Sequence, residues 1–540
     1  MTEIQTWIKE IEGYINRDED ISTESYADFI ENPELALPII DCIDELDEGS
    51  VEDSHATYTA CVFILDVCVT QLQSAAENGN KIAAKTLKKL MSHMANIIKT
   101  AKHGLGFWLP ILNAFYEVNV ELADDLKSAY FELANQENKL EIISERSHLD
   151  SIREVILDLS DLSIYDIAEN FFAQSSAMPE EFFIDLVLDL YSIEEGQEIA
   201  LLSLLHPKPE VRDYIVAAID SIIHTVTLSS DSLSRLQVIK SWYPVSYHSM
   251  MDNWIKIQRK KGVVFNLQRN LSTITNIQGT EIDGGGAQGI FMQIKRSRKN
   301  RLCGLLLKSS IGIKDAWMTP VISVSDIKQY KAESFDETIC LRKIDLEYLE
   351  LMANHFLAET LESYGMPDLH LLEIQEELGL NFVPKKIDVD EVIEKLGVLI
   401  NPFTEEVVEA SLKRSKNWLK TKNFAESWFI ESQKIDRLVN QCSSFEDGVK
   451  VCRLQEAVES VFQNYLEQSR QEWVFHFLWV SLWAKSGCRE NEKLWQDSFI
   501  IAYSINSGRQ LNTIPLLQEI CLQSVINSMK TMQERGTHLT

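Results

Sequence analysis

The residues with the clearest chemical potential lie near the middle of the chain, in a glycine-rich turn. This turn contains Asp283, Gly284, Gly285, Gly286 and Gly289. Successive glycines expose backbone N–H groups, which can cradle a phosphate when the loop leads into a helix. Here the loop leads into an alternating apolar segment that is typical of a strand, and no Gly-Lys-Ser/Thr follows it. We therefore predict that the turn is a flexible entry to a sheet, without a nucleotide cofactor.

Basic residues concentrate between Trp254 and Lys308, although the whole chain has a net charge of −31. The acidic residues in that stretch are Glu281 and Asp283 alone. The candidate interaction surface that we select consists of Arg296, Arg298, Lys299, Arg301, Lys260, Lys261 and Arg269. Such a surface can bind an anionic partner, or it can dock on the acidic N-terminal region of the same chain, and both interpretations stay open. Apart from Phe291, aromatic residues are absent around the basic turn, which gives little support for stacking of single-stranded bases.

Residues that could act in catalysis or metal binding are few. No Gly-x-Ser-x-Gly motif is present, and Asp283 and Asp315 are the carboxylates that we would test for catalysis. His355 and Glu359 lie four positions apart, as two metal ligands on a helix would, but this spacing is more typical of a surface ion pair. His476 lies within an aromatic run and is interpreted as a core histidine. We predict a protein that is not an enzyme and holds no metal or cofactor.

Composition and cysteine spacing favour a globular protein of a reducing compartment. The 540 residues are 45% hydrophobic, with 21 glycines and 12 prolines. The nine cysteines include no Cys-x-x-Cys pair and no histidine at zinc-finger spacing. The N-terminus lacks a signal-peptide pattern, and the longest apolar run, 473–484, is shorter than the roughly 20 residues that span a bilayer. We predict a cytoplasmic protein without a membrane partner.

Apolar residues recur every three or four positions over most of the chain, which is typical of amphipathic helices. Residues 58–72 are apolar on most sides and are expected to form a central helix. Residues 445–485 are expected to form one very long helix or two, and 515–532 the last helix. The final residues, 533–540, are expected to be disordered.

The exception is the stretch 271–324, where β-branched residues and period-two alternation predict strands. The expected strands are 272–277, 290–295 and 302–308, with Trp317, Met318 and the strand 321–324 closing the sheet. The basic turn 296–300 has the length of a hairpin connection. The predicted fold class is mainly α, with a solenoid or helical-bundle architecture and a small antiparallel β insert in the middle of the chain.

One segment, residues 206–219, carries a family resemblance. Pro209 presets a first helical turn, a Val-Arg pair ends at Arg212, and Ala217 and Ala218 permit close helix packing. This pattern resembles a HEAT repeat, and the resemblance covers 195–245. It implies helix pairs stacked into a curved solenoid, which generally serves as a binding surface.

We divide the chain into four parts on these grounds. They are an acidic helical domain at 1–150, HEAT-like repeats at 151–260, a β insert at 261–330 and a C-terminal helical domain at 331–540. The expected function is that of an intracellular protein-interaction scaffold or adaptor with another protein as its partner. The alternative is a nucleic-acid-binding accessory protein that uses the basic β-hairpin 290–308.

Overall fold

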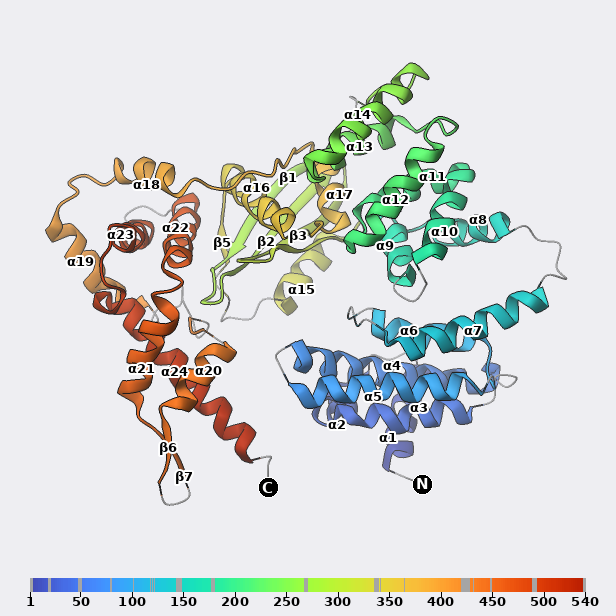
Figure 1. Ribbon diagram of the computed structural model, residues 1–540, viewed down its shortest axis with the longest axis horizontal. Helices are drawn as coiled ribbons and strands as arrows, with labels where there is room; N and C mark the ends of the chain where they lie inside the picture. Colours follow the sequence, from blue (N-terminus) through green and yellow to red (C-terminus); the bar gives the residue numbers. More distant parts are fainter. Residues whose placement is uncertain are drawn as a thin grey trace. The chain divides into compact units, whose positions relative to one another are not determined.

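The computed structural model divides into two compact units, which are described separately (Figure 1). Unit 1 consists of Met1–Ser203 with Ala217–Ile219, and unit 2 of Leu204–Val216 with Asp220–Thr540. The structure describes all residues except 1–2, 18–20, 47–50, 78–79, 101, 117, 119, 121, 142–147, 176–179, 267–270, 335–338, 340, 364, 419–427, 431, 447–448, 488–492 and 538–540. The predicted four-part division is finer than these two units and stays a prediction.

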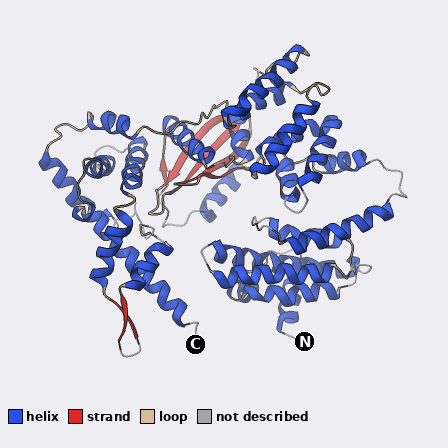
Figure 2. Ribbon diagram, in the orientation of Figure 1, coloured by secondary structure: helices blue, strands red, loops and turns tan. Residues whose placement is uncertain are grey.

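Unit 1 is built from helices, as Figure 2 shows in blue. They are α1 (Glu3–Asn16), α2 (Thr23–Glu31), α3 (Ala36–Glu45), α4 (Val51–Glu77), α5 (Lys81–Ile98), α6 (Leu105–Tyr116), α7 (Asp124–Glu141), α8 (His148–Asp158), α9 (Ile164–Ser175), α10 (Glu180–Ser192) and α11 (Gln197–Leu202). One continuous apolar core joins α1 to α7. The predicted central helix is confirmed, because α4 contacts α1, α2, α3, α5 and α6 and buries Ile64, Leu65 and Val69 in that core.

Helix α4 is also the one helix in the described part of the chain that is long and apolar enough to cross a membrane, over Ala56–Glu77. The core helix of a soluble protein passes the same test, and 39% of the most apolar window is buried inside the structure. Because α4 packs against five other helices, its apolar composition has an explanation within unit 1.

Unit 2 contains three helices, a central sheet with its covering helices, and a C-terminal group of helices. The first helices are α12 (Pro209–Ile222), α13 (Ser230–Trp242) and α14 (Val245–Lys260). The sheet and the helices around it are β1 (Thr273–Thr280), β2 (Ala287–Arg296), β3 (Lys299–Lys308), β4 (Gly312–Met318), α15 (Val324–Ser334), β5 (Leu341–Lys343), α16 (Leu346–Glu362) and α17 (Leu369–Leu378). The C-terminal group is α18 (Val389–Gly397), α19 (Glu405–Ser415), α20 (Gln433–Gln441), β6 (Ser443–Glu446), β7 (Val449–Cys452), α21 (Leu454–Val461), the π-helical turn Phe462–Leu466, α22 (Arg470–Ser486), α23 (Leu494–Asn506) and α24 (Pro515–Thr537).

The central sheet is antiparallel with the strand order β4-β3-β2-β1-β5, which confirms the predicted β insert in a mainly helical chain. One row across the sheet pairs Ile277, Met292, Cys303 and Met318, and all four side chains are buried. This row lies on the inner face, which α16 and α17 cover (Figure 1). Strand periodicity of two therefore places the next row on the opposite, outer face.

Three expectations for local structure are wrong in part. Strand β4 closes the sheet and contains the expected Trp317 and Met318, but 321–324 is not a strand and holds the isolated bridge from Ile322 to Asn300 before α15 begins. The stretch 445–485, predicted as one very long helix or two, contains the two helices α21 and α22, but the chain first forms the hairpin β6–β7 and helix starts only at Leu454. The expected disorder at the end is wrong for Gln533 to Thr537, which continue α24.

The segment that resembles a HEAT repeat places Arg212 against the bend that precedes its own helix. Its guanidinium donates to the carbonyl oxygens of His206 and Pro207 at 2.7 and 2.8 Å. Tyr243, at the end of α13, donates to the carbonyl of Leu204. These bonds satisfy otherwise open carbonyls of the bend and fix the angle at which α12 starts. They describe one helix pair, and the repeat assignment stays a prediction.

Candidate functional site

The tip of the β2–β3 hairpin carries the exposed part of the predicted basic surface. Arg296 and Lys299 form its last cross-strand pair, and Ser297 adopts a left-handed φ of 57° that closes the turn. Lys295, Arg296, Arg298 and Lys299 are exposed, with 51% of the Arg296 side chain accessible. Four cations therefore lie within one turn at the end of the sheet.

Other arginines near this end of the sheet are held by carboxylates of α17. Arg301 donates to Glu373 at 2.9 Å and to the carbonyl of Thr319 at 2.6 Å. Arg235 of α13 makes a two-pronged pair with Glu376, at 3.0 and 3.2 Å. Arg296 also lies 3.8 Å from Glu377, so it is partly neutralised although it is exposed. Within the predicted surface, Arg301 is therefore held against α17, whereas Arg298 and Lys299 are exposed.

The other predicted basic residues lie at the end of α14. Lys260 is exposed, and the ammonium of Lys261 donates to the carbonyls of Ile223 and Val226. Arg269 lies outside the described residues. Lys261 therefore closes the end of α12 and belongs to the local fold as well as to the surface.

The glycine-rich turn uses its own N–H groups. The Asp283 carboxylate accepts from the amide of Ala287 at 2.8 Å, and the Asp283 carbonyl accepts from Gly286 at 3.1 Å. The amide of Gly289 donates to the hydroxyl of Thr280 at 3.0 Å. Gly286 has a φ of 72°, and a Cβ there would lie 2.6 Å from Oγ of Ser309. Gly284 is buried and Gly285 exposed within the same turn.

Asp283 therefore shapes the turn, and several of the amides that a phosphate would need are already engaged. Asp315 lies on β4, exposed and opposite Leu306 of β3. In the register of the sheet, Leu306 also pairs with Gly289. The two carboxylates considered for catalysis thus occupy a turn and an outer strand position.

The outer face of the sheet holds an aromatic row that sequence reasoning missed. Cross-strand pairing aligns Gln278, Phe291, Gly304 and Trp317, and Gln278 also pairs with the exposed Lys343. The Trp317 indole lies across Gly304, where a Cβ would be 2.6 Å from the ring. Phe291 and Trp317 have ring centroids 6.1 Å apart and are half-buried.

The row extends onto α15, where Tyr330 lies 5.8 Å from Trp317 and is 37% exposed. The signal for it was a glycine inside a strand, which often marks a place where another group packs closely. Without the register, nothing in the sequence places Trp317 beside Phe291. Near the basic turn, Phe291 is the aromatic residue that the sequence shows, whereas the pairing of the strands adds Trp317 and Tyr330 on the same face of the sheet.

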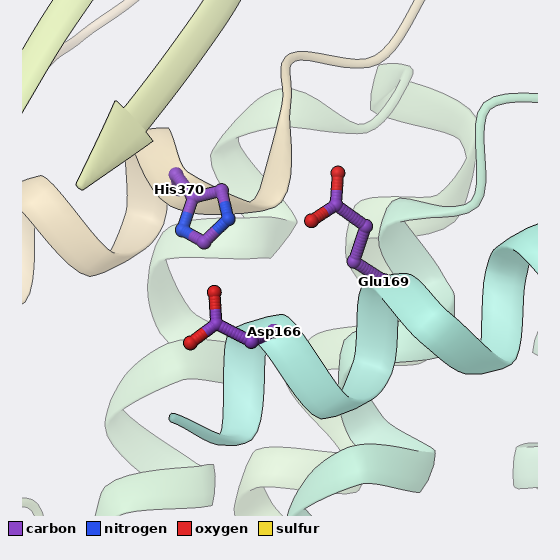
Figure 3. A group of neighbouring side chains, drawn as sticks. All are labelled: Asp166, Glu169 and His370. Atoms are coloured by element: carbon purple, nitrogen blue, oxygen red, sulfur yellow. The ribbon is translucent and has the colours of Figure 1, made fainter. Parts of the chain in front are cut away.

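Figure 3 draws three potential metal ligands, Asp166, Glu169 and His370. Asp166 and Glu169 lie one turn apart on α9 of unit 1, whereas His370 opens α17 of unit 2. In unit 2, Nδ1 of His370 pairs with Glu373 at 2.8 Å. Because the three side chains belong to different units, they do not form a metal centre within either unit.

Comparison with known proteins relates two parts of the chain to one protein family. Residues 390–529 match the Y4lR C-terminal helical domain, and residues 179–262 match the Y4lR second domain. The chain is also similar to the uncharacterised protein y4lR of Sinorhizobium fredii (strain NBRC 101917 / NGR234), with 22% identity over 374 residues. That similarity covers 67% of this chain and 68% of the relative. No solved structure matches the chain.

The two matched parts precede and follow the central sheet in the sequence. The second-domain match spans α10 to α14, and the C-terminal match spans α18 to most of α24. The sheet with α15, α16 and α17 lies between them in the sequence. The basic hairpin tip and the aromatic row thus belong to a stretch that neither family model covers.

Proposed function

We propose that the chain is a cytoplasmic protein-interaction scaffold on a helical-repeat frame, and that the β2–β3 tip binds an acidic surface of a partner protein. The supporting observation is the exposure of Lys295, Arg296, Arg298 and Lys299 in one turn of a chain whose net charge is −31. Opposite charges across an interface steer association and fix the orientation of the partners. The basic turn supplies the positive side of such a contact.

The shape of the turn favours a compact acidic cluster as its target. The turn lies at the end of a hairpin of two ten-residue strands, and Arg301 ties that end of the sheet to α17, to which Arg235 also holds α13. A partner therefore meets cations with a fixed backbone, so less backbone entropy is lost on binding. Exposed charges are screened by salt, so the association should weaken as ionic strength rises.

The test is affinity capture from cell extract with the double charge reversal Arg298→Glu/Lys299→Glu. The matched control is Lys88→Glu/Lys89→Glu, which reverses two adjacent exposed lysines on α5. We expect the tip variant to lose partners that the control and the unmodified chain retain at low salt. Identical partners for all three proteins, or capture that does not change with salt, would refute the proposal.

A second candidate function is binding of single-stranded nucleic acid on the outer face of the sheet. It is favoured by the aromatic row of Phe291, Trp317 and Tyr330, with Lys343 at the end of the same row. Aromatic side chains stack on any base and contribute about 1–3 kcal/mol per stacked base. Lys295 on the same face could contact phosphates.

The second candidate is tested with fluorescently labelled single-stranded oligonucleotides and the full chain. Trp317→Ala should weaken binding about tenfold, which corresponds to one lost stacking contact. Tyr214→Ala on α12, which removes an aromatic ring that is 55% exposed, is the control and should change nothing. Equal affinity of the unmodified chain and both variants, or affinity that does not fall as salt rises, counts against nucleic-acid binding. Binding of a partner protein would then remain as the proposed function.

A further inference from the structure

A buried donor and a buried acceptor face each other on α16 without partners. His355 and Glu359 lie one turn apart, with Nε2 of the imidazole 3.5 Å from Oε1 of the carboxylate. That separation is too long for a good hydrogen bond. Nε2 of His355 and Oε2 of Glu359 are both buried and have no hydrogen-bond partner. The expected surface pair is therefore wrong, because only 5% of the His355 side chain is exposed.

The backbone fixes which nitrogen of His355 carries the proton. The amide of Ile387 donates to Nδ1 at 3.1 Å, so Nδ1 is the acceptor nitrogen. A neutral imidazole has one donor and one acceptor nitrogen, which leaves Nε2 as an N–H donor. Burial lowers the pKa of His355 to about 4, so the ring is neutral at pH 7. A nitrogen that carries a proton does not bind a metal ion, and this excludes Nε2 as a ligand in this tautomer.

The surroundings of Glu359 keep its second oxygen available. Burial raises the pKa of this carboxyl group, while nearby Lys386 and a hydrogen bond from the backbone amide of Ser310 act in the opposite direction. Ser310 has a left-handed φ of 66° in the β3–β4 turn. The Phe475 ring lies over the imidazole, with centroids 4.4 Å apart, and limits its movement. About a fifth of the Glu359 side chain is exposed, so the pair lies close to the protein surface.

The same unit contains a closed version of this pair. His370 and Glu373 lie three residues apart on α17, and their side chains meet directly at 2.8 Å. A histidine and a glutamate on one helix can therefore form a direct hydrogen bond in this fold. His355 and Glu359 keep a wider separation, and leaving two buried polar groups unpaired is unfavourable unless another group pairs with them.

We propose that His355 and Glu359 bind a hydroxyl group, which accepts a hydrogen bond from Nε2–H and donates one to Oε2. A single oxygen can make both bonds, because the donor and the carboxylate lie next to each other. An ammonium group cannot accept from Nε2–H, and a carbonyl group cannot donate to Oε2. The hydroxyl belongs either to a buried water or to a small alcohol or polyol that enters beside Glu359.

The test is a crystal structure of the full chain at a resolution that shows ordered water, grown without polyols and then soaked in glycerol. We expect one oxygen within about 3 Å of both Nε2 and Oε2. A water that stays after the soak identifies water as the source, and replacement by a glycerol hydroxyl identifies a polyol site. Direct closure of the pair, or no atom between the two groups, overturns the proposal.

The tautomer of His355 can also be tested in solution, by spectroscopy on variants of the full chain. In nitrogen-15 spectra of histidine-labelled full chain, His355 should carry its proton on Nε2, and His355→Gln assigns the signal by removing it. Glu359→Leu should lose the bound oxygen but keep this tautomer, because the Ile387 amide still donates to Nδ1. A proton on Nδ1 would contradict the argument directly. The directly paired His370 is the internal reference within the same spectra.

Discussion

A buried hydrogen-bond network around Gln288 joins the sheet to the C-terminal helices, and its removal gives the sharpest prediction. Oε1 of Gln288 accepts from the Tyr348 hydroxyl of α16 at 2.6 Å and from Nε1 of Trp479 of α22 at 3.2 Å. Nε2 of Gln288 donates to the Thr280 carbonyl of β1 at 2.8 Å. Nε1 of Trp479 also lies 2.9 Å from the Tyr348 oxygen. Gln288, Tyr348 and Trp479 are buried, so water does not replace a lost bond.

Gln288→Leu preserves the approximate side-chain volume and removes both polar atoms. The Tyr348 hydroxyl then still accepts from Trp479 but has no acceptor for its own proton. One fully buried donor left unpaired costs about 1–3 kcal/mol of unfolding free energy. Tyr348→Phe should cost less, about 1 kcal/mol, because Trp479 keeps Gln288 as its acceptor. In the double variant the orphaned hydroxyl is gone, but Nε1 of Trp479 loses both of its acceptors, so one buried donor stays unpaired and the double variant should be no more stable than Gln288→Leu.

The assay is urea unfolding followed by fluorescence, with the two single variants and the double variant compared to the unmodified chain. Because the network lies in unit 2, we expect only the unfolding transition of that unit to move. Phe291→Leu on the outer face of the same strand is the control, since it removes an aromatic ring without touching the network. A loss below about 0.5 kcal/mol for Gln288→Leu, or a double variant that is more stable than Gln288→Leu, would refute the reasoning.

Two further predictions concern pH and a tightly packed glycine. Burial lowers the pKa of His206, His355 and His476 to about 4, below the value of 6.5 expected in an unfolded chain. Unfolding therefore takes up protons, and the unfolding free energy of unit 2 should fall by about 3 kcal/mol per histidine as the pH drops from 6.5 toward 4. A urea midpoint that does not change over this pH range would exclude the effect. Gly312→Ala should destabilise the chain several-fold more than Gly262→Ala, because both glycines have positive φ but only at Gly312 would a Cβ lie within 2.6 Å of main-chain atoms of α16. Equal melting temperatures for these two variants would contradict the packing argument.

The sequence predicts the fold class well because helices and strands have different apolar periods. The strands around residues 290–295 and 302–308 are found at nearly the predicted positions, where the alternation is strong. The strand predicted at 321–324 is wrong although that segment contains three β-branched residues, whereas β4, which holds the expected Trp317 and Met318, includes Lys314, Asp315 and two small residues. These residues form a strand because of their position in the sheet: β4 lies at an edge, where it pairs only with β3.

The candidate sites are less predictable, because they depend on contacts between distant segments. Local charge indicated the basic turn, but nothing in the sequence near Arg301 shows that Glu373 neutralises it from 72 positions away. The same applies to His355. Its spacing from Glu359 is visible in the sequence, but the Ile387 amide that fixes its tautomer comes from the chain after α17. Charge and periodicity are local properties, whereas partner identity is set by the tertiary fold.

Helix α17 explains how an acidic chain can present a basic surface at one place. Its residues Glu373, Glu376 and Glu377 lie within five positions, and they hold Arg301, Arg235 and Arg296 respectively. Buried arginine–carboxylate pairs with good geometry fix position more reliably than they add stability. The pairs of Arg235 and Arg301 therefore fix α13 and the end of the β2–β3 hairpin against one helix, and the longer contact of the exposed Arg296 adds to them. Arg298 and Lys299 lie beyond these pairs and are exposed, so the acidic residues of α17 hold the base of the hairpin tip in place and leave its outermost charges in solvent.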